Sequence, residues 1–332
     1  MARNERLPLI AAIQDLRGSK LICYITGDRD NVSTRMAPDV IRVFHRHLEE
    51  LGPQPKIDLY LYTRGGDVLT PWRLVNLLRE YTENLAVLIP FRAYSAGTLL
   101  ALGANEIVMG KMGELGPIDP SVANAFNPDD PYNPRAKIPV SVEDVSSYLL
   151  LAKEMAGLKS EQEVSDVFRF LSEKVHPLAL GNVHRNYLLI RSLARRLLRL
   201  HLNHAPEERI NDIIDNLTEK LYAHNHMISR REAKSDIGLE VTIPDSRLEE
   251  ILWKLWETYE KDLQLAEPFN PALFLSDNQQ TARFEVSGGL IESQVRVDSF
   301  VFTGFVRGTG VDPSGKPGVN VQIEQQKWVE SE

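Results

Sequence analysis

The sequence predicts an α/β fold built on a largely parallel sheet. Short apolar runs rich in branched and aromatic residues alternate with helical patterns, the connections between them are short, and the alternation continues over about 90 residues. The chain has 332 residues, 43% of them hydrophobic and 25% charged, which is globular composition for more than one average domain. Composition therefore excludes an extended disordered, collagen-like or disulfide-stapled chain.

The alternation begins near residue 20. Apolar runs at 20–27, 57–62, 85–91 and 106–110 predict four strands. Helical spacing of apolar residues predicts helices at 36–51, 68–81 and 95–103. Because each strand is followed by a helix, these segments are expected to form layers with the sheet in the middle.

A proline-rich segment at 116–139 reads as a long loop, of a length that is usually functional or poorly ordered. Helices are expected at 141–158, 160–176, 182–203, 206–222 and 246–263. Strand runs at 282–287, 294–306 and 319–325, broken by Gly288-Gly289 and a turn at 312–318, predict a small C-terminal β appendage. The expected division is an N-terminal arm at 1–19, a catalytic domain at 20–245, and a C-terminal helix with the β appendage at 246–332.

The charge and cysteine content of the chain indicate which partners it can bind and in which cellular compartment it is expected. The balance of 38 basic and 46 acidic residues gives a net charge of −8, so no overall basic footprint for nucleic acid exists. The single cysteine, Cys23, forms no internal disulfide, which fits a reducing compartment such as the cytoplasm. The uncharged run from Leu7 to Gln14 is too short for a secretory signal, and no apolar stretch is long enough for a transmembrane helix.

Two strand-to-helix junctions carry the chemistry. The first is the segment Tyr62-Thr63-Arg64-Gly65-Gly66-Asp67, and the second runs from Arg92 to Thr98 and contains Tyr94-Ser95-Ala96-Gly97. Tandem glycines let the backbone turn with its N–H groups exposed, and a helix N-terminus adds unpaired donors. Such donors can hold a developing oxyanion beside a serine. Taken singly, the glycines read as an ordinary turn and Ser95 as a helix N-cap; the two junctions are informative because they share one edge of the sheet.

These segments resemble the Clp/crotonase superfamily of serine peptidases, and within it the signal peptide peptidase A-like group, in particular the serine dehydrogenase proteinases. The resemblance covers roughly residues 21–241 and rests on YTRGGDV at 62–68, AYSAGTLLALG at 93–103, EIVM at 106–109, GELGPIDP at 113–120 and residues 222–241. It implies repeated ββα units, Ser95 as the nucleophile, and an oxyanion hole lined by Gly65, Gly66 and Ala96. It also implies a peptide or protein substrate and assembly into a homo-oligomer.

A serine hydroxyl needs a base to take its proton. Clp-type subunits use histidine, but the first histidine after Ser95 is the distant His176. The signal peptide peptidase A-like enzymes use lysine, and Lys137 lies 42 residues after Ser95 (137 − 95), with Lys153 58 residues after it (153 − 95). Lys137 is the first choice for the base. The alternative is that Lys137 is a solvated cation on a loop, and that Lys153 lies on a solvated helix face.

The other polar residues that could take part in catalysis or bind a metal are expected to have structural roles. Asp67 and Asp119 are expected to cap helices or form turns, with an orienting role for the lysine as the minor option. His45 and His47 are two residues apart and therefore face different sides of their helix. His201 and His204 lack a His-Glu-x-x-His pattern, so no metal is expected, and no cofactor either.

The helix expected at 182–203 carries five arginines and no acidic residue. A basic amphipathic helix can bind a membrane surface or nucleic acid. The favoured interpretation is pairing within the protein or at a subunit interface, because Glu207, Glu208, Asp212 and Asp215 follow directly. Peripheral membrane contact stays open.

Two other function classes remain beside the Ser-Lys peptidase. One is a catalytically inactive oligomeric scaffold of the same fold. The other is a crotonase-type thioester enzyme, in which the oxyanion hole stabilises an enolate and no nucleophilic serine is needed. Amino-acid dehydrogenase activity, which the family name suggests, has no support because the chain contains no Gly-x-Gly-x-x-Gly fingerprint.

Overall fold

The computed structural model describes residues 2–118, 121–122, 125–133, 135–219, 221, 226–275, 280–311 and 317–331. The chain divides into two compact units. The first comprises Met1–Leu115 with Met227–Glu332, and the second is Gly116–His226. The domain boundaries expected at residues 19 and 245 stay predictions.

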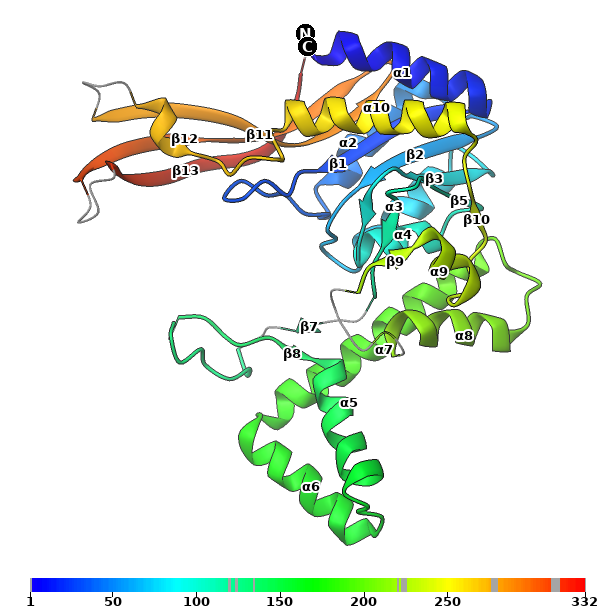
Figure 1. Cartoon of the computed structure of the whole chain (residues 1–332), viewed down its shortest axis with the longest axis vertical. Helices are drawn as coiled ribbons and strands as arrows, with labels where there is room; N and C mark the ends of the chain where they lie inside the picture. Colours follow the sequence, from blue (N-terminus) through cyan, green and yellow to red (C-terminus); the bar gives the residue numbers. More distant parts are fainter. Residues whose placement is uncertain are drawn as a thin grey trace. The chain divides into compact units, whose positions relative to one another are not determined.

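An eight-stranded mixed sheet forms the centre of the first unit (Figure 1). Five parallel strands stand in the order β10 (Val241–Thr242), β5 (Glu106–Met109), β3 (Leu85–Ile89), β2 (Ile57–Tyr62) and β1 (Lys20–Thr26). Three antiparallel strands follow beyond β1, namely β11 (Thr281–Ser293), β12 (Val297–Val311) and β13 (Pro317–Glu330). The predicted α/β fold class is confirmed, and the C-terminal strands extend the main sheet as a long ribbon.

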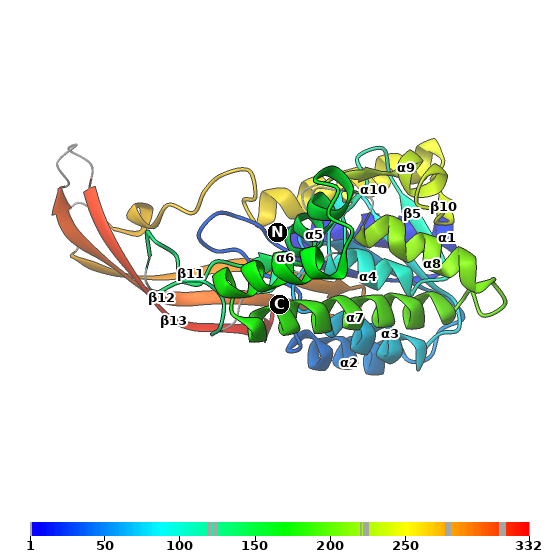
Figure 2. The same ribbon diagram turned by 90° about the horizontal axis from the view of Figure 1, so that it is seen from below.

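Helices cover both faces of this sheet (Figure 2). Helices α1 (Ala2–Arg17) and α10 (Ser246–Asp262) lie side by side on one face, and α2 (Val40–Leu51), α3 (Thr70–Arg79) and α4 (Ala96–Leu102) form a row on the other. Every residue of β2 and β3 is buried, as expected for parallel strands that are covered on both sides. The segment expected as an N-terminal arm is helix α1, and it buries Ile10 and Ile13 in the core shared with α10.

The C-terminal glycines do not end a strand. Gly288 and Gly289 lie inside β11, where the pairing with β12 shifts by one residue. A Cβ on Gly288 would meet the Phe302 ring at 2.4 Å and the Thr34 methyl at 2.9 Å. The glycine therefore permits a bulge and close packing here, which corrects the expectation of a strand break.

A small second sheet lies at the carboxyl ends of the parallel strands. It contains β4 (Arg92–Ala93), β6 (Glu114–Leu115) and β9 (Ile228–Ser229), the last leading into α9 (Arg230–Ser235). Strand β4 follows β3 after two residues and leads directly to Ser95 and α4. This sheet thus sets the position of the serine relative to the end of β2.

The second unit is mainly helical. A two-stranded sheet, β7 (Ser121–Val122) and β8 (Val140–Ser141), precedes the helices α5 (Val142–Leu150), α6 (Glu161–Lys174), α7 (Pro177–Arg199) and α8 (Glu207–Thr218). The helix expected at 141–158 is α5 followed by a π-helical turn at Leu151–Met155. The loop expected at 116–139 contains β7 and an isolated bridge between Asp129 and Lys137.

Three arginines of α7 pair with carboxylates within this unit. Arg191 binds Asp215 and Glu219, while Arg195 and Arg199 both reach Glu207. The expected pairing within the protein is confirmed for these three arginines. Arg185 and Arg196 of the same helix are exposed.

Candidate functional site

The two junctions identified in the sequence meet at one edge of the sheet. The Thr63 N–H donates to the Arg92 carbonyl at 2.9 Å, and the Tyr94 N–H donates to the Thr63 carbonyl at 3.0 Å. These two bonds form a parallel bridge between Thr63 and Ala93. The end of β2 and the approach to Ser95 are therefore joined backbone to backbone.

Two residues further on, Gly65 contacts the serine turn. A Cβ placed on Gly65 would lie 3.0 Å from Ser95 Cβ, 3.0 Å from the Tyr94 carbonyl oxygen and 3.3 Å from the Ala96 nitrogen. Gly65 has φ = +100°, a conformation that a side chain would strain. Glycine is therefore favoured at position 65 for two reasons: its backbone conformation and the lack of room for a side chain.

Ser95 adopts an unusual backbone conformation. Its φ and ψ are +53° and −108°, which residues with a side chain rarely adopt. It occupies the N-cap position of α4, but its side chain makes no capping hydrogen bond. The side chain is partly exposed, and Oγ has no hydrogen-bond partner among the described residues. The N-cap explanation therefore does not account for this serine, and its hydroxyl is available for chemistry.

The backbone amides around Ser95 differ in what they bind. The Gly65 N–H donates to Thr63 Oγ1 at 3.0 Å. Gly65 O and Asp67 N are both bonded to Met36, so the Gly66 N–H between them points away from that strand segment. Within the described part of the chain, the amides of Gly66 and Ala96 have no acceptor.

Met36 and Thr63 were not identified as site residues in the sequence. Met36 approaches so closely that a Cβ on Gly66 would lie 2.0 Å from its carbonyl oxygen. Met36 precedes α2 and is nearly thirty residues from the glycines in sequence. No local pattern marks Met36, whereas Thr63 stands two residues before Gly65 inside the first junction.

Two polar side chains of the junctions have local partners. Burial and a hydrogen bond to Glu114 raise the pKa of Tyr94 to about 12, so its phenol keeps its proton near neutral pH. The Asp67 carboxylate accepts hydrogen bonds from the Leu69 N–H and from the backbone and hydroxyl of Thr70. Asp67 therefore caps the start of α3, as expected, while Asp119 lies outside the described residues.

Comparison with known proteins fits this geometry. Residues 39–177 match the family model of ClpP-like SDH-type serine proteinases. The resemblance noted in the sequence is thereby confirmed over those residues, which include both junctions and both candidate lysines. The family match also agrees with the layered α/β arrangement of the first unit.

Two relatives come from Methanocaldococcus jannaschii. The uncharacterized protein MJ0137 is 25% identical over 208 residues, which are 63% of this chain and 60% of the relative. The uncharacterized protein MJ1495 is 29% identical over 128 residues, 36% of this chain and 42% of the relative. The chain thus spans less than two thirds of the length of either relative.

Both candidate lysines of this family match belong to the second unit. Lys137 Nζ lies 2.7 Å from Asp129 Oδ1, and the Lys137 side chain is about one third exposed. Lys153 stands on the π-helical turn and lines a cavity of about 750 Å³ together with Leu149, Leu158 and Phe168. Their relation to Ser95 stays a prediction.

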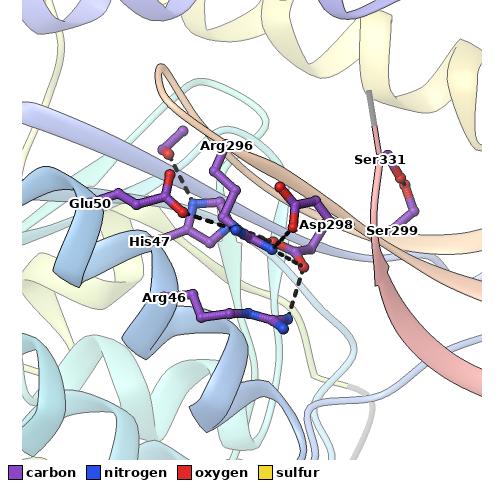
Figure 3. A network of polar contacts seen from close by, with 9 residues as sticks. Arg46, His47, Glu50, Arg296, Asp298, Ser299 and Ser331 are labelled. Atoms are coloured by element: carbon purple, nitrogen blue, oxygen red, sulfur yellow. Dashed lines mark hydrogen bonds and ion pairs between the residues drawn. The ribbon is translucent and has the colours of Figure 1, made fainter.

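A second serine, distant in sequence, makes a hydrogen-bonded chain with a histidine and an aspartate. His47 Nδ1 lies 2.9 Å from Ser293 Oγ, and its Nε2 lies 3.2 Å from Asp298 Oδ2 (Figure 3). All three residues are fully buried, and Arg296 and Arg46 also bind the Asp298 carboxylate. No substrate can reach this serine, so the group is structural and joins α2 to the C-terminal strands.

The neighbouring histidine, His45, is more than half exposed, which confirms that His45 and His47 face different sides of α2. In the described ranges, no three His, Cys, Asp or Glu side chains gather as they would around a metal ion. The same residues contain no helix with both the length and the hydropathy needed to cross a bilayer.

Proposed function

We propose that this protein is a serine peptidase in which Ser95 forms the acyl-enzyme. The observation that carries the proposal is the contact between the strained Ser95 and Gly65, at a turn where two backbone amides have no acceptor among the described residues. A strained serine at a strand-to-helix turn presents its hydroxyl outward, which suits a nucleophile. The match of residues 39–177 to a serine proteinase family supports the same assignment.

The oxyanion would be held by the N–H groups of Gly66 and Ala96. The Gly65 N–H is bound to Thr63 Oγ1, so Gly65 lines the hole by lacking a side chain. Ala96 begins α4, where helical N–H groups have no intrahelical partner. Donors fixed in advance at the place where charge develops stabilise the tetrahedral intermediate, and losing one costs roughly 10²- to 10³-fold in rate.

Lys137 is proposed as the general base. As Ser95 Oγ attacks the substrate carbonyl carbon, its proton passes to the neutral amine of Lys137. When the intermediate collapses and the peptide C–N bond breaks, the Lys137 ammonium gives that proton to the departing amine. Water then hydrolyses the ester with the same amine as base. Lys137 must leave its ion pair with Asp129 to act in this way, because only a neutral amine accepts a proton.

The test of the nucleophile is labelling by a fluorophosphonate probe, read by intact-mass spectrometry. The native protein should gain one adduct, mapped to Ser95, and Ser95→Ala should gain none. Equal labelling of the two proteins would reject the proposal, as would a native protein that neither labels nor cleaves a diverse peptide library. Stabilisation by coenzyme A in place of labelling would indicate the thioester class.

The base is tested with a matched pair of lysine variants. Lys137→Ala should lower the rate of peptide cleavage by roughly 10²- to 10⁴-fold, and Lys153→Ala should leave it within about twofold. The reverse result would transfer the role to Lys153. Assembly into a homo-oligomer stays a prediction that sedimentation analysis can test on the same samples.

A further inference from the structure

Thr63 lies between the two halves of the candidate site. It is the first residue after β2, its side chain is completely buried, and its backbone makes both bonds of the bridge to β4. The role proposed below rests on the proposed peptidase function, but the contacts themselves do not depend on it.

The Thr63 hydroxyl holds the glycine turn. Its Oγ1 accepts the Gly65 N–H at 3.0 Å, a side-chain-to-backbone bond that closes a tight turn over Thr63-Arg64-Gly65. It also accepts the hydroxyl of Thr26 at 2.8 Å, and Thr26 is buried at the end of β1. The conformation of Gly65, and hence the direction of the next amide, thus depends on a hydroxyl anchored to the neighbouring strand.

The Thr63 methyl group holds the serine helix. A Cβ on Gly97 would lie only 2.5 Å from Thr63 Cγ2, so the first turn of α4 packs directly on this methyl. Gly97 is two residues after Ser95 and one after Ala96. One side chain therefore contacts both the turn that carries Gly66 and the helix turn that carries Ala96.

We propose that Thr63 is a positioning residue that sets the two oxyanion donors relative to Ser95, its hydroxyl fixing the Gly65-Gly66 turn and its methyl fixing the start of α4. The two contacts are separable by chemistry. Valine keeps the methyl and loses the hydroxyl, serine keeps the hydroxyl and loses the methyl, and alanine lacks both. The native protein and these three variants form a double-mutant cycle. In it the hydroxyl contact and the methyl contact are each removed alone and both together.

The first readout is the rate of Ser95 acylation by a fluorophosphonate, together with kcat and KM for a cleaved peptide. Thr63→Val should acylate and turn over roughly tenfold more slowly than the native protein with KM little changed, because a misplaced donor weakens the transition state rather than binding. Thr63→Ser keeps the hydroxyl and loses the methyl, so it should also be slower than the native protein, by about threefold. Native rates for both Thr63→Val and Thr63→Ser would overturn the proposal.

The second readout does not depend on activity. Hydrogen–deuterium exchange in the peptide that covers residues 63–69 should quicken by about tenfold at one amide in Thr63→Val and Thr63→Ala, but not in Thr63→Ser, since Gly65 loses its acceptor only in the first two. Unchanged exchange in Thr63→Val would overturn the proposal. If Thr63→Val does not fold, the Thr63→Ser and Thr63→Ala pair makes the same comparison.

A matched control exists in the same unit. Thr82 is also buried, and its Oγ1 accepts the Asn84 N–H at 3.2 Å in a turn of the same kind. Thr82→Val should lose comparable stability while keeping the native acylation rate. If it slows acylation as much as Thr63→Val does, the effect is general destabilisation and the proposal fails. A native protein without any acylation would reject the peptidase function, and the exchange result would still decide whether Thr63 holds the turn.

Discussion

Gly65 and Ser95 are in direct contact, with only 3.0 Å between Ser95 Cβ and the point where a Cβ on Gly65 would lie. The contact joins the turn after β2 to the start of α4, and the two residues are thirty positions apart in sequence (95 − 65). It places the strained serine beside a turn whose conformation favours glycine.

The first prediction concerns this contact. Gly65→Ala should abolish acylation of Ser95, because the added carbon meets Ser95 Cβ, the Tyr94 carbonyl and the Ala96 nitrogen, and should cost about 1–3 kcal/mol of stability. Gly52→Ala is the control, since Gly52 also has a positive φ of +66° but nothing within 4 Å of an added carbon. A Gly65→Ala protein that still labels at the native rate would contradict the proposed geometry.

The second prediction separates strain from chemistry at Ser95. Both Ser95→Ala and Ser95→Gly lack the nucleophile and should be inactive. Only glycine relieves the positive φ of +53°, so Ser95→Gly should be about 1 kcal/mol more stable than Ser95→Ala. Denaturant unfolding of the two variants checks the difference. If alanine is the more stable of the two, the backbone at Ser95 is not strained.

The third prediction is a pH dependence of stability. Burial opposes ionisation of Asp298, but hydrogen bonds from His47 and Arg296 and the charge of Arg296 outweigh it and lower the pKa of Asp298 to about 2. An unfolded aspartate titrates near 3.9. The stability that this group contributes is therefore complete above about pH 4 and is lost as the pH falls through 2.

Asp298→Asn should remove this part of the acid dependence and lower the free energy of unfolding at pH 7 by roughly 2 kcal/mol or more. Glu324→Gln, at an exposed position on β13, should follow the native protein. Unfolding by urea between pH 2.5 and 7 makes the comparison. Parallel native and Asp298→Asn curves over this range would show that Asp298 is not the responsible group.

The fourth prediction concerns the arginine face of α7. Arg191→Ala should destabilise the second unit by about 1 kcal/mol, because it breaks partly buried pairs with Asp215 and Glu219, and salt should reduce the difference. Arg196→Ala changes an exposed arginine on the same helix and should have little effect. Hydrogen exchange in α7 and α8 measures both. If the native protein binds anionic vesicles and Arg196→Ala weakens that binding, the exposed side of α7 has a membrane role instead.

Several elements of both units could be predicted from the sequence. The strand at 57–62 coincides with β2, and the arginine pairing on α7 follows from charges in adjacent segments. No helix is predicted from the sequence at Ala2–Arg17, because the stability of α1 depends on packing Ile10 and Ile13 against α10, which is over 200 residues away in sequence. The glycines at 288 and 289 were misread because their role is close packing against Thr34 and Phe302.

The local sequence is enough to predict where the backbone can turn and which side chain can react. Tandem glycines and small residues at a helix start indicate this, because conformational freedom is a property of each single residue. Which contacts those residues make is known only from the folded structure. The contact of Met36 with Gly66, the packing of Gly97 on Thr63, and the lack of a partner for Ser95 Oγ among the described residues all result from segments that meet at one sheet edge. Such meetings depend on long-range packing, which no local pattern of residues specifies.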